Sequence, residues 1–431
     1  MTLLKKLKAP LIFILIGLLT VPWEEHEKWV WRGMILYSLP LLCYAIGSAK
    51  SKEWGFLIGL CMILQAIASP IIIDKISLRD YVTLEPNFHN TINVKKGSIT
   101  GIEGEQGYTT DEKGFRVTKK INYDNKPDNT LRIFTVGAST VEGMLLGDHV
   151  NWPPLLQNKL NETLTSKNTE VINTGKSATT ARNHLATLKQ ITKYEPDLVV
   201  FLLGGNDWHS HITVSQAPEK HSVGFLSKLG IHLPTKTKEC IHVIRIATRF
   251  DYTIIAEIFK TIKLRFKKTE RKQDSIYQNF AGGAIVTYMG SLNRPDKRVF
   301  RPAQVTPEYR YFVAEMVDTC KDKNIACVFA NQPTAYQNDA GDEIKKTFWI
   351  TPFEEEYTLD FPSLVHIASL YNEFLIKYAR DNHVTGCDLA SQTPPTFDYF
   401  WDGVHFNIGG AKKASEIIFE CVMKTLGTKT N

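Results

Sequence analysis

The run Asp197–Leu203 is apolar at every position after its first residue and ends in the turn Gly204–Asp207. A continuous apolar run of this length is typical of a strand that is buried on both faces of a parallel sheet. Parallel strands need long connections, usually helices, and those helices cover the two faces of the sheet. The run therefore predicts an α/β fold for the part of the chain around it.

Strands and helices are expected to alternate on both sides of this run. The expected strands lie near Ile133–Gly137, Glu170–Asn173, Ile325–Ala330 and Gly386–Leu389, and the expected helices near Trp152–Leu164, Ala181–Lys193, Pro307–Lys323, Pro362–Asn382 and Gly409–Leu426. This order predicts a doubly wound parallel sheet over residues 131–427, with its functional site at the carboxyl ends of the strands. The alternation breaks at about 208–304, where we expect an insertion.

Three short turns are expected at that edge of the sheet: Gly137-Ala138-Ser139, Asn173-Thr174-Gly175 and Gly204–Asp207. Ser139 stands between a strand and a helix. Its hydroxyl is exposed there, and the following backbone N–H groups are free to face a developing anion. On this turn alone, a helix cap explains Ser139 equally well.

A fourth motif, Asp402-Gly403-Val404-His405, lies in a loop before the last helix. Its spacing lets a carboxylate and an imidazole approach one serine from the same loop. His405 would take the proton of Ser139 as general base, and Asp402 would hold the imidazole in the required tautomer. Alone, the motif is weak, and a helix-capping loop also explains it.

The order of these four motifs resembles that of the SGNH, or GDSL-type, hydrolase family. The resemblance covers about Leu131–Leu426 apart from the insertion. It implies a three-layer, flavodoxin-like fold and a serine ester hydrolase that uses no metal or other cofactor. The first motif of the family usually reads Gly-Asp-Ser-Leu, and Ala138 stands in place of that aspartate. This departure puts the hydrogen bonding around the serine turn in doubt.

The resemblance also assigns roles to individual residues. It implies that Ser139 is the nucleophile and that Asp402 and His405 complete the triad. It implies that the N–H of Gly175 and the side-chain amide of Asn206 bind the oxyanion, beside the N–H of Ser139.

Three apolar runs crowd the N-terminus: Ala9–Trp23, Trp29–Gly47 and Trp54–Ile73. The second and third approach the roughly 20 residues that span a bilayer. We expect residues 1–74 to be an anchor of three transmembrane helices and residues 75–130 to be a linker with short strands. Lysines precede the first run and follow the second, so the positive-inside rule places the N-terminus in the cytoplasm and the large domain outside it. If the first run does not span the membrane, the large domain faces the cytoplasm.

Two segments have open interpretations. Lys113–Val117 is either a β element that docks on the following domain or part of a plain spacer. A basic amphipathic helix is expected around Ile254–Phe266 in the insertion. It is either a lid packed on the core or a helix that lies on an anionic membrane surface.

Composition argues against some classes of function. The net charge of +6 over 431 residues is too small to argue for nucleic-acid binding. The sequence has no zinc-type Cys/His spacing, and we interpret His209 and His211 as surface residues because no third ligand is in view. Two of the seven cysteines lie in the N-terminal apolar runs. We interpret the other five as mostly buried thiols with at most one disulfide.

These observations favour a membrane-anchored serine esterase that acts on O-acyl groups of envelope glycans or lipids. Its partners would be the lipid bilayer and the acylated substrate. An O-acyltransferase that modifies a cell-envelope polysaccharide would use the same triad. Three spans are too few to carry an acyl donor across the membrane, so this alternative needs a membrane acyltransferase partner. A binding or scaffold protein on the same fold is a third hypothesis, which the presence of all three triad residues disfavours.

Overall fold

The computed structural model describes residues 80–216, 290–349 and 357–427. Within them, five parallel strands form one sheet: β3 (Thr130–Gly137), β4 (Asn168–Asn173), β5 (Leu198–Leu203), β7 (Ala326–Asn331) and β9 (Thr385–Cys387). Every residue of β5 is buried. A strand covered on both faces has no solvent side, which is why its sequence is apolar throughout.

The strands lie in the order β4-β3-β5-β7-β9. Numbered along the chain this is 2-1-3-4-5, the order of flavodoxin-like folds. The order reverses between β3 and β5, which pair as far as Gly137 and Leu202. Ligands of open α/β sheets bind at such a reversal, outside the carboxyl ends of the strands. The predicted α/β class and parallel sheet are confirmed.

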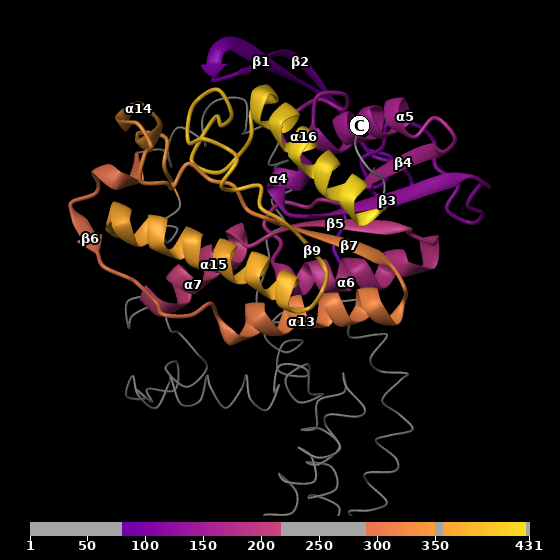
Figure 1. Ribbon diagram of the computed structural model, residues 1–431. Coiled ribbons are helices and arrows are strands. Elements are labelled where there is room, and N and C mark those ends of the chain that lie inside the picture. The colour runs from indigo at the N-terminus through magenta and orange to yellow at the C-terminus, as the bar shows by residue number, and fades with distance from the viewer. Residues whose placement is uncertain (1–79, 217–289, 350–356, 428–431) are drawn as a thin grey trace, which may run out of the picture. The chain divides into compact units, whose positions relative to one another are not determined.

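Helices cover both faces of the sheet (Figure 1). On one face α5 (Trp152–Thr163) packs against α16 (Ile408–Thr425), and the other face is covered by α6 (Ala181–Ile191), α13 (Pro307–Asp322) and α15 (Phe361–Asp381). The remaining helical segments are α4 (Ser139–Glu142), α7 (Gly205–Gln216), α14 (Asp342–Lys345) and the 3-10 turns η1 (Thr192–Tyr194) and η4 (Ser291–Asn293). The described part therefore has three layers: helix, sheet and helix.

Residues 89–117 fold onto this domain. β1 (His89–Ile99) and β2 (Ile102–Thr109) form an antiparallel hairpin. The N–H of Arg116 then donates to the carbonyl of Asn173 at 2.9 Å, and the N–H of Asn173 donates to the carbonyl of Arg116 at 3.1 Å. Lys113–Val117 therefore docks on the end of β4 through Arg116, and residues 80–130 of the predicted linker contain the β1–β2 hairpin.

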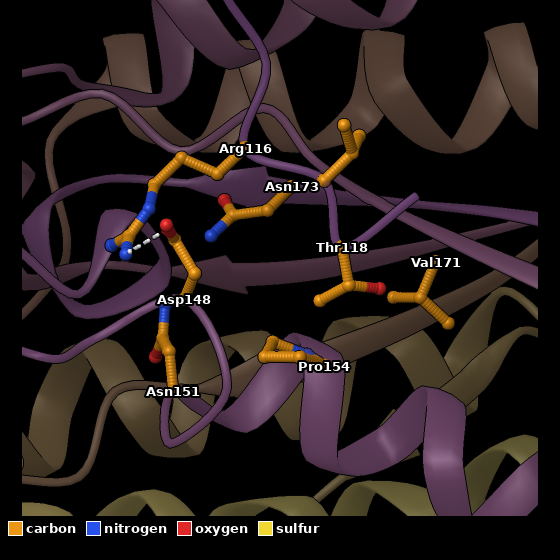
Figure 2. A pocket seen from close by; sticks show the side chains of 8 residues that line it. Arg116, Thr118, Asp148, Asn151, Pro154, Val171 and Asn173 are labelled. Carbon is orange, nitrogen blue, oxygen red and sulfur yellow. Dashed lines mark hydrogen bonds and ion pairs between the residues drawn. The ribbon is translucent and has the colours of Figure 1, made fainter. Parts of the chain in front are cut away.

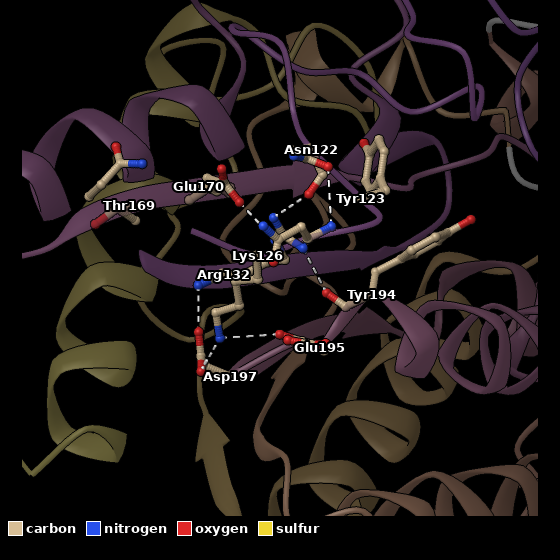
Figure 3. A network of polar contacts seen from close by, with 12 residues as sticks. Asn122, Tyr123, Lys126, Arg132, Thr169, Glu170, Tyr194, Glu195 and Asp197 are labelled. Atoms are coloured by element: carbon tan, nitrogen blue, oxygen red, sulfur yellow. Dashed lines mark hydrogen bonds and ion pairs between the residues drawn. The ribbon is translucent and has the colours of Figure 1, made fainter. Parts of the chain in front are cut away.

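A buried ion pair lies at the opposite, amino-terminal edge of the sheet (Figure 3). The fully buried guanidinium of Arg132, in β3, donates to Glu170 Oε2 in β4 at 2.7 Å. It also donates to the carbonyl oxygens of Tyr194 and Asn122, at 2.9 and 2.8 Å. A buried charge needs its hydrogen bonds satisfied in this way. The network ties the segment before β3 to the edge of the sheet that lies away from Ser139.

In the described ranges, two disulfides cross-link the domain. Cys320–Cys327 joins the end of α13 to β7, and Cys387–Cys421 joins β9 to α16. The expectation of at most one disulfide was wrong. In each pair a helix packs back onto a strand and brings the two Cα atoms to 6.4 and 5.9 Å. Neither the number nor the spacing of the cysteines reveals that proximity.

The predicted insertion begins and ends in ordered structure. Trp208, at its predicted start, is buried in α7. Its last part contains η4 and β6 (Asp296–Arg298), which pairs in parallel with β8 (Tyr357–Leu359). The basic helix of the insertion and the three N-terminal apolar runs lie outside the described residues. In the ranges that are described, no helix has the length and apolarity needed to cross a bilayer.

Candidate active site

Ser139 is the first residue of α4 and follows β3 after a tight turn. The turn requires glycine at position 137, because a Cβ there would lie 2.7 Å from the carbonyl oxygen of Leu202 and 2.4 Å from a Val141 methyl. Glycine thus lets the turn pack directly on β5. Within the described residues the N–H of Ser139 donates to no protein acceptor, so it is available to a ligand.

Ser139, His405 and Asp402 form one chain of hydrogen bonds. The Oγ of Ser139 lies 2.8 Å from Nε2 of His405, and Nδ1 of His405 lies 2.8 Å from Oδ2 of Asp402. Because Nδ1 donates its proton to the carboxylate, Nε2 is left to accept the hydroxyl proton of Ser139. The structure thus brings together the three residues that the sequence suggested for the triad.

The carboxylate of Asp402 is 1% exposed and is held on both oxygens. Its Oδ1 accepts the backbone N–H groups of Val404 and His405 at 2.7 and 2.6 Å. Its Oδ2 accepts the indole N–H of Trp349 at 2.8 Å in addition to the imidazole. These hydrogen bonds hold the carboxylate in one orientation toward the imidazole. Nothing in the sequence pattern pointed to Trp349.

The geometry does not support the predicted role of Gly175. Its N–H donates to Oδ1 of Asn173 at 2.8 Å, so it is not available to an oxyanion. A Cβ at position 175 would lie 2.2 Å from the backbone nitrogen of Glu142. The glycine is therefore required for close packing of this loop on α4, which is a structural reason for its presence.

Ala178, three residues further along the same loop, has the properties expected of a backbone donor. It is exposed, it has a left-handed φ of 63°, and within the described residues its N–H donates to no protein acceptor. The neighbouring carbonyl of Thr179 accepts one amide hydrogen of Asn206 at 2.8 Å. An amide carries two hydrogens, so Asn206 keeps one for a ligand beside Ala178.

Ala138 stands where an aspartate was expected in the serine turn. Glu142 supplies a carboxylate close to that position. It is fully buried on α4, and it accepts the N–H of Ser177 at 2.5 Å and the hydroxyl of Tyr108 at 2.8 Å. The first bond attaches the loop that carries Ala178 to the helix that carries Ser139. The second attaches β2 to the same carboxylate.

Arg116 stabilises the other end of α4. Its guanidinium donates to the carbonyl oxygens of Glu142, Gly143 and Leu146, at 2.5, 2.8 and 2.8 Å. Unsatisfied carbonyls at a helix C-terminus favour a cation in this position. A 2.8 Å ion pair with Asp148 completes the cluster, which borders a small cavity shown in Figure 2.

Asp207 fixes the far end of the Ala178 loop. Its carboxylate oxygens accept the N–H of Ala181 at 3.0 and 3.2 Å, at the first residue of α6. Burial raises the pKa of Asp207 to about 7, although the hydrogen bond from Ala181 acts in the opposite direction. Asn206 and Asp207 therefore both orient the loop through their side chains.

His211 is less exposed than the sequence suggested. Its Nδ1 lies 3.2 Å from the hydroxyl of Tyr371, and its ring meets that of Phe300 edge to face. Burial lowers the pKa of His211. In the part of the chain that the structure describes, no group of three or more His, Cys, Asp or Glu side chains is arranged to hold a metal ion.

Residues 135–413 match the model of the GDSL-like Lipase/Acylhydrolase family. No curated protein matches the chain significantly. Among solved structures, an acetylxylan esterase variant from Geobacillus stearothermophilus is similar, with 11% identity and a TM-score of 0.35 over 71% of this chain and 97% of that one. A lipolytic G-D-S-L family protein from Veillonella parvula has 10% identity and a TM-score of 0.34 over 67% and 96% of the two chains. Likenesses of this size do not assign a substrate.

Proposed function

The chain belongs to the GDSL-like lipase/acylhydrolase family and is an ester hydrolase, and from this we propose that Ser139, His405 and Asp402 cleave O-acyl esters through an acyl-enzyme. The observation that carries the proposal is the unbroken hydrogen-bond chain from the Ser139 hydroxyl to the buried Asp402 carboxylate. His405 takes the hydroxyl proton as Ser139 attacks the ester carbonyl, and it returns that proton to the departing alcohol. Water then repeats the sequence on the acyl-enzyme.

Three donors would stabilise the tetrahedral oxyanion. They are the N–H of Ser139, the N–H of Ala178 and the remaining amide hydrogen of Asn206. Ala178 replaces Gly175 in this set, because the N–H of Gly175 is already donated to Asn173. Backbone and amide donors that are fixed before the reaction cost no reorganisation when the charge develops.

The test is ester hydrolysis by the full-length protein in detergent, with short and long acyl chains and an acetylated glycan as substrates. Ser139→Ala and His405→Ala are each expected to lower kcat by at least about 10³-fold. A fluorophosphonate should label the wild type and a Ser98→Ala control, whose serine is exposed in the hairpin, but not Ser139→Ala. Labelling of Ser139→Ala would contradict the assignment of the nucleophile. Acyl transfer to added glycan in place of release to water would identify a transferase that works with an acyl-donating partner.

We further propose that the domain lies outside the cytoplasm, held to the membrane by three N-terminal helices, and acts on O-acyl groups of envelope glycans or lipids. The apolar runs in residues 1–74 and their flanking lysines support this topology. The two disulfides add independent support, since disulfides persist in oxidising compartments and are rare in the cytosol. A reporter that works only outside the cytoplasm should be active when it is fused after Ile73. If a reporter that works only in the cytoplasm is active at the same position, the topology is wrong.

A further inference from the structure

Among the residues that the structure describes, one donor from outside its own loop reaches the carboxylate of Asp402. Three of its donors belong to residues 402–405, namely two backbone N–H groups and the imidazole. The fourth is the indole Nε1–H of Trp349, which reaches Oδ2 at 2.8 Å. This is the same oxygen that accepts the proton of His405 Nδ1. The triad is thus joined to a segment more than fifty residues away in the sequence.

The backbone beside Trp349 is well anchored. The preceding residue, Phe348, is fully buried and packs on the ring of Tyr336 with centroids 4.3 Å apart. Its carbonyl accepts both the N–H and the hydroxyl of Ser291, at 3.0 and 2.8 Å. An indole attached to such a backbone has limited freedom to leave Asp402.

The indole is also aligned with the imidazole. The ring planes of Trp349 and His405 differ by 5°, with centroids 6.0 Å apart. Two N–H groups in nearly parallel rings therefore approach one carboxylate oxygen. The Trp349 donor fixes the rotation of the carboxylate and shares the electron density that Oδ2 offers to the imidazole.

We propose that Trp349 is a positioning residue of the triad, which acts through Asp402 to fix the orientation of His405 and to moderate its basicity. The inference rests on the proposed function, because it assumes that His405 is the general base. Removing the indole N–H leaves Oδ2 a stronger acceptor for the imidazole proton. The protonated imidazole then becomes more stable, and the enzyme needs a higher pH to free its base.

The decisive variant is Trp349→Phe in the full-length protein, which keeps an aromatic ring and removes the donor. We expect kcat to fall about ten- to a hundredfold, the range for a hydrogen bond to a charged group, with KM changed less than about twofold. The acidic limb of the kcat/KM profile should move to higher pH. A rise in KM alone, or an unshifted limb with reduced kcat, would overturn the proposal.

Trp401→Phe is the matched control. Its ring is also nearly parallel to His405, at 11° and 5.1 Å, but it has no hydrogen bond to Asp402 among the described contacts. It should leave the acidic limb where it is. His209 on α7 meets the Trp349 indole edge to face at 6.3 Å and is a second titratable group at this point. His209→Gln should leave the shift caused by Trp349→Phe intact, and loss of the shift in that background would assign it to His209 and refute the proposal.

A double-mutant cycle keeps the proposal testable if Trp349→Phe folds poorly. In an Asp402→Asn background the charged acceptor is gone, so Trp349→Phe should lower kcat by less than about twofold. An undiminished effect would show that Trp349 acts through packing, because coupled residues lose additivity and independent ones keep it. Failure of the proposed function is seen separately, as a wild type without esterase activity that depends on Ser139.

Discussion

At the scale of single residues, the oxyanion donor that the sequence predicts differs from the donor that the geometry favours. The donor role of Gly175 was predicted from the family resemblance, which implies a backbone N–H at this position. The structure gives this glycine another reason, close contact with α4. Ala178, the donor proposed in its place, could not be found from the sequence, because an alanine does not indicate a left-handed backbone, which costs a non-glycine residue about 1–2 kcal/mol. The triad residues, in contrast, could be proposed from the sequence, because the side chains of serine, histidine and aspartate themselves supply the nucleophile, the base and the orienting carboxylate.

Asn206→Ala is expected to lower kcat by about 10²–10³-fold with little change in KM, because the amide acts mainly on the transition state. Steady-state kinetics on a short-chain ester measures this. Asn183→Ala is the matched control: Asn183 Oδ1 accepts the N–H of Thr180 at 3.1 Å and so steadies the same loop without offering a donor to substrate. If both variants lose activity equally, loop order and not the Asn206 amide is responsible.

At the scale of elements, Glu142 connects three segments that are far apart in the chain. It joins α4 to the loop after β4 through Ser177 and to the β1–β2 hairpin through Tyr108. The hairpin could not be predicted in detail, because in β1 only Ile92 and Val94 are buried and the strand alternation is correspondingly weak. The strands of the main sheet were predictable because their apolar runs are long and bounded by turns.

Tyr108→Phe should destabilise the domain by about 1.5–3 kcal/mol, because it removes a hydrogen bond to a buried charged group. Denaturant unfolding measures the change. Tyr378→Phe is the control: Tyr378 is half-buried on α15, its hydroxyl has no hydrogen bond among the described contacts, and a change within about 0.5 kcal/mol is expected. Equal losses in both variants would mean that the Tyr108–Glu142 hydrogen bond adds no more to the free energy of unfolding than the hydroxyl of Tyr378 does.

At the scale of the whole molecule, two groups with shifted pKa values make stability depend on pH in opposite directions. Burial lowers the pKa of His184, on α6, to about 3. The unfolded chain takes up a proton below about pH 6.5 and the folded chain does not, so stability falls as pH falls from about 6.5 toward 3. The raised pKa of Asp207, about 7, makes the folded chain retain a proton that the unfolded chain loses. The contribution of Asp207 to the stability of the fold therefore declines as pH rises from about 4 toward 7.

His184→Gln should flatten the loss of thermal stability between pH 6.5 and 4, whatever its effect at neutral pH, because the titrating group is gone. Melting temperatures across that range measure the slope. The exposed His149 offers the control, since His149→Gln should keep the wild-type slope. An unchanged slope in His184→Gln would show that His184 is not the group that titrates on unfolding.

The whole-molecule architecture was the most predictable level, because strand–helix alternation leaves few topologies for a chain like this. The sequence did not reveal which distant segments meet. Trp349 reaching Asp402 and the two cysteine pairs are products of tertiary packing, and no local pattern encodes them.

The Cys387–Cys421 bond has a consequence for the catalytic loop. The two cysteines are 34 positions apart and enclose both Asp402 and His405, so the acid–base half of the site lies inside a covalently closed ring of chain. A single cut in the exposed stretch around Ser391 would leave both residues attached to the body of the enzyme. After reduction of the bond, the same cut would leave His405 and Ser139 on two fragments that no covalent bond joins. Resistance of the active site to nicking is thus tied to the redox state of its surroundings.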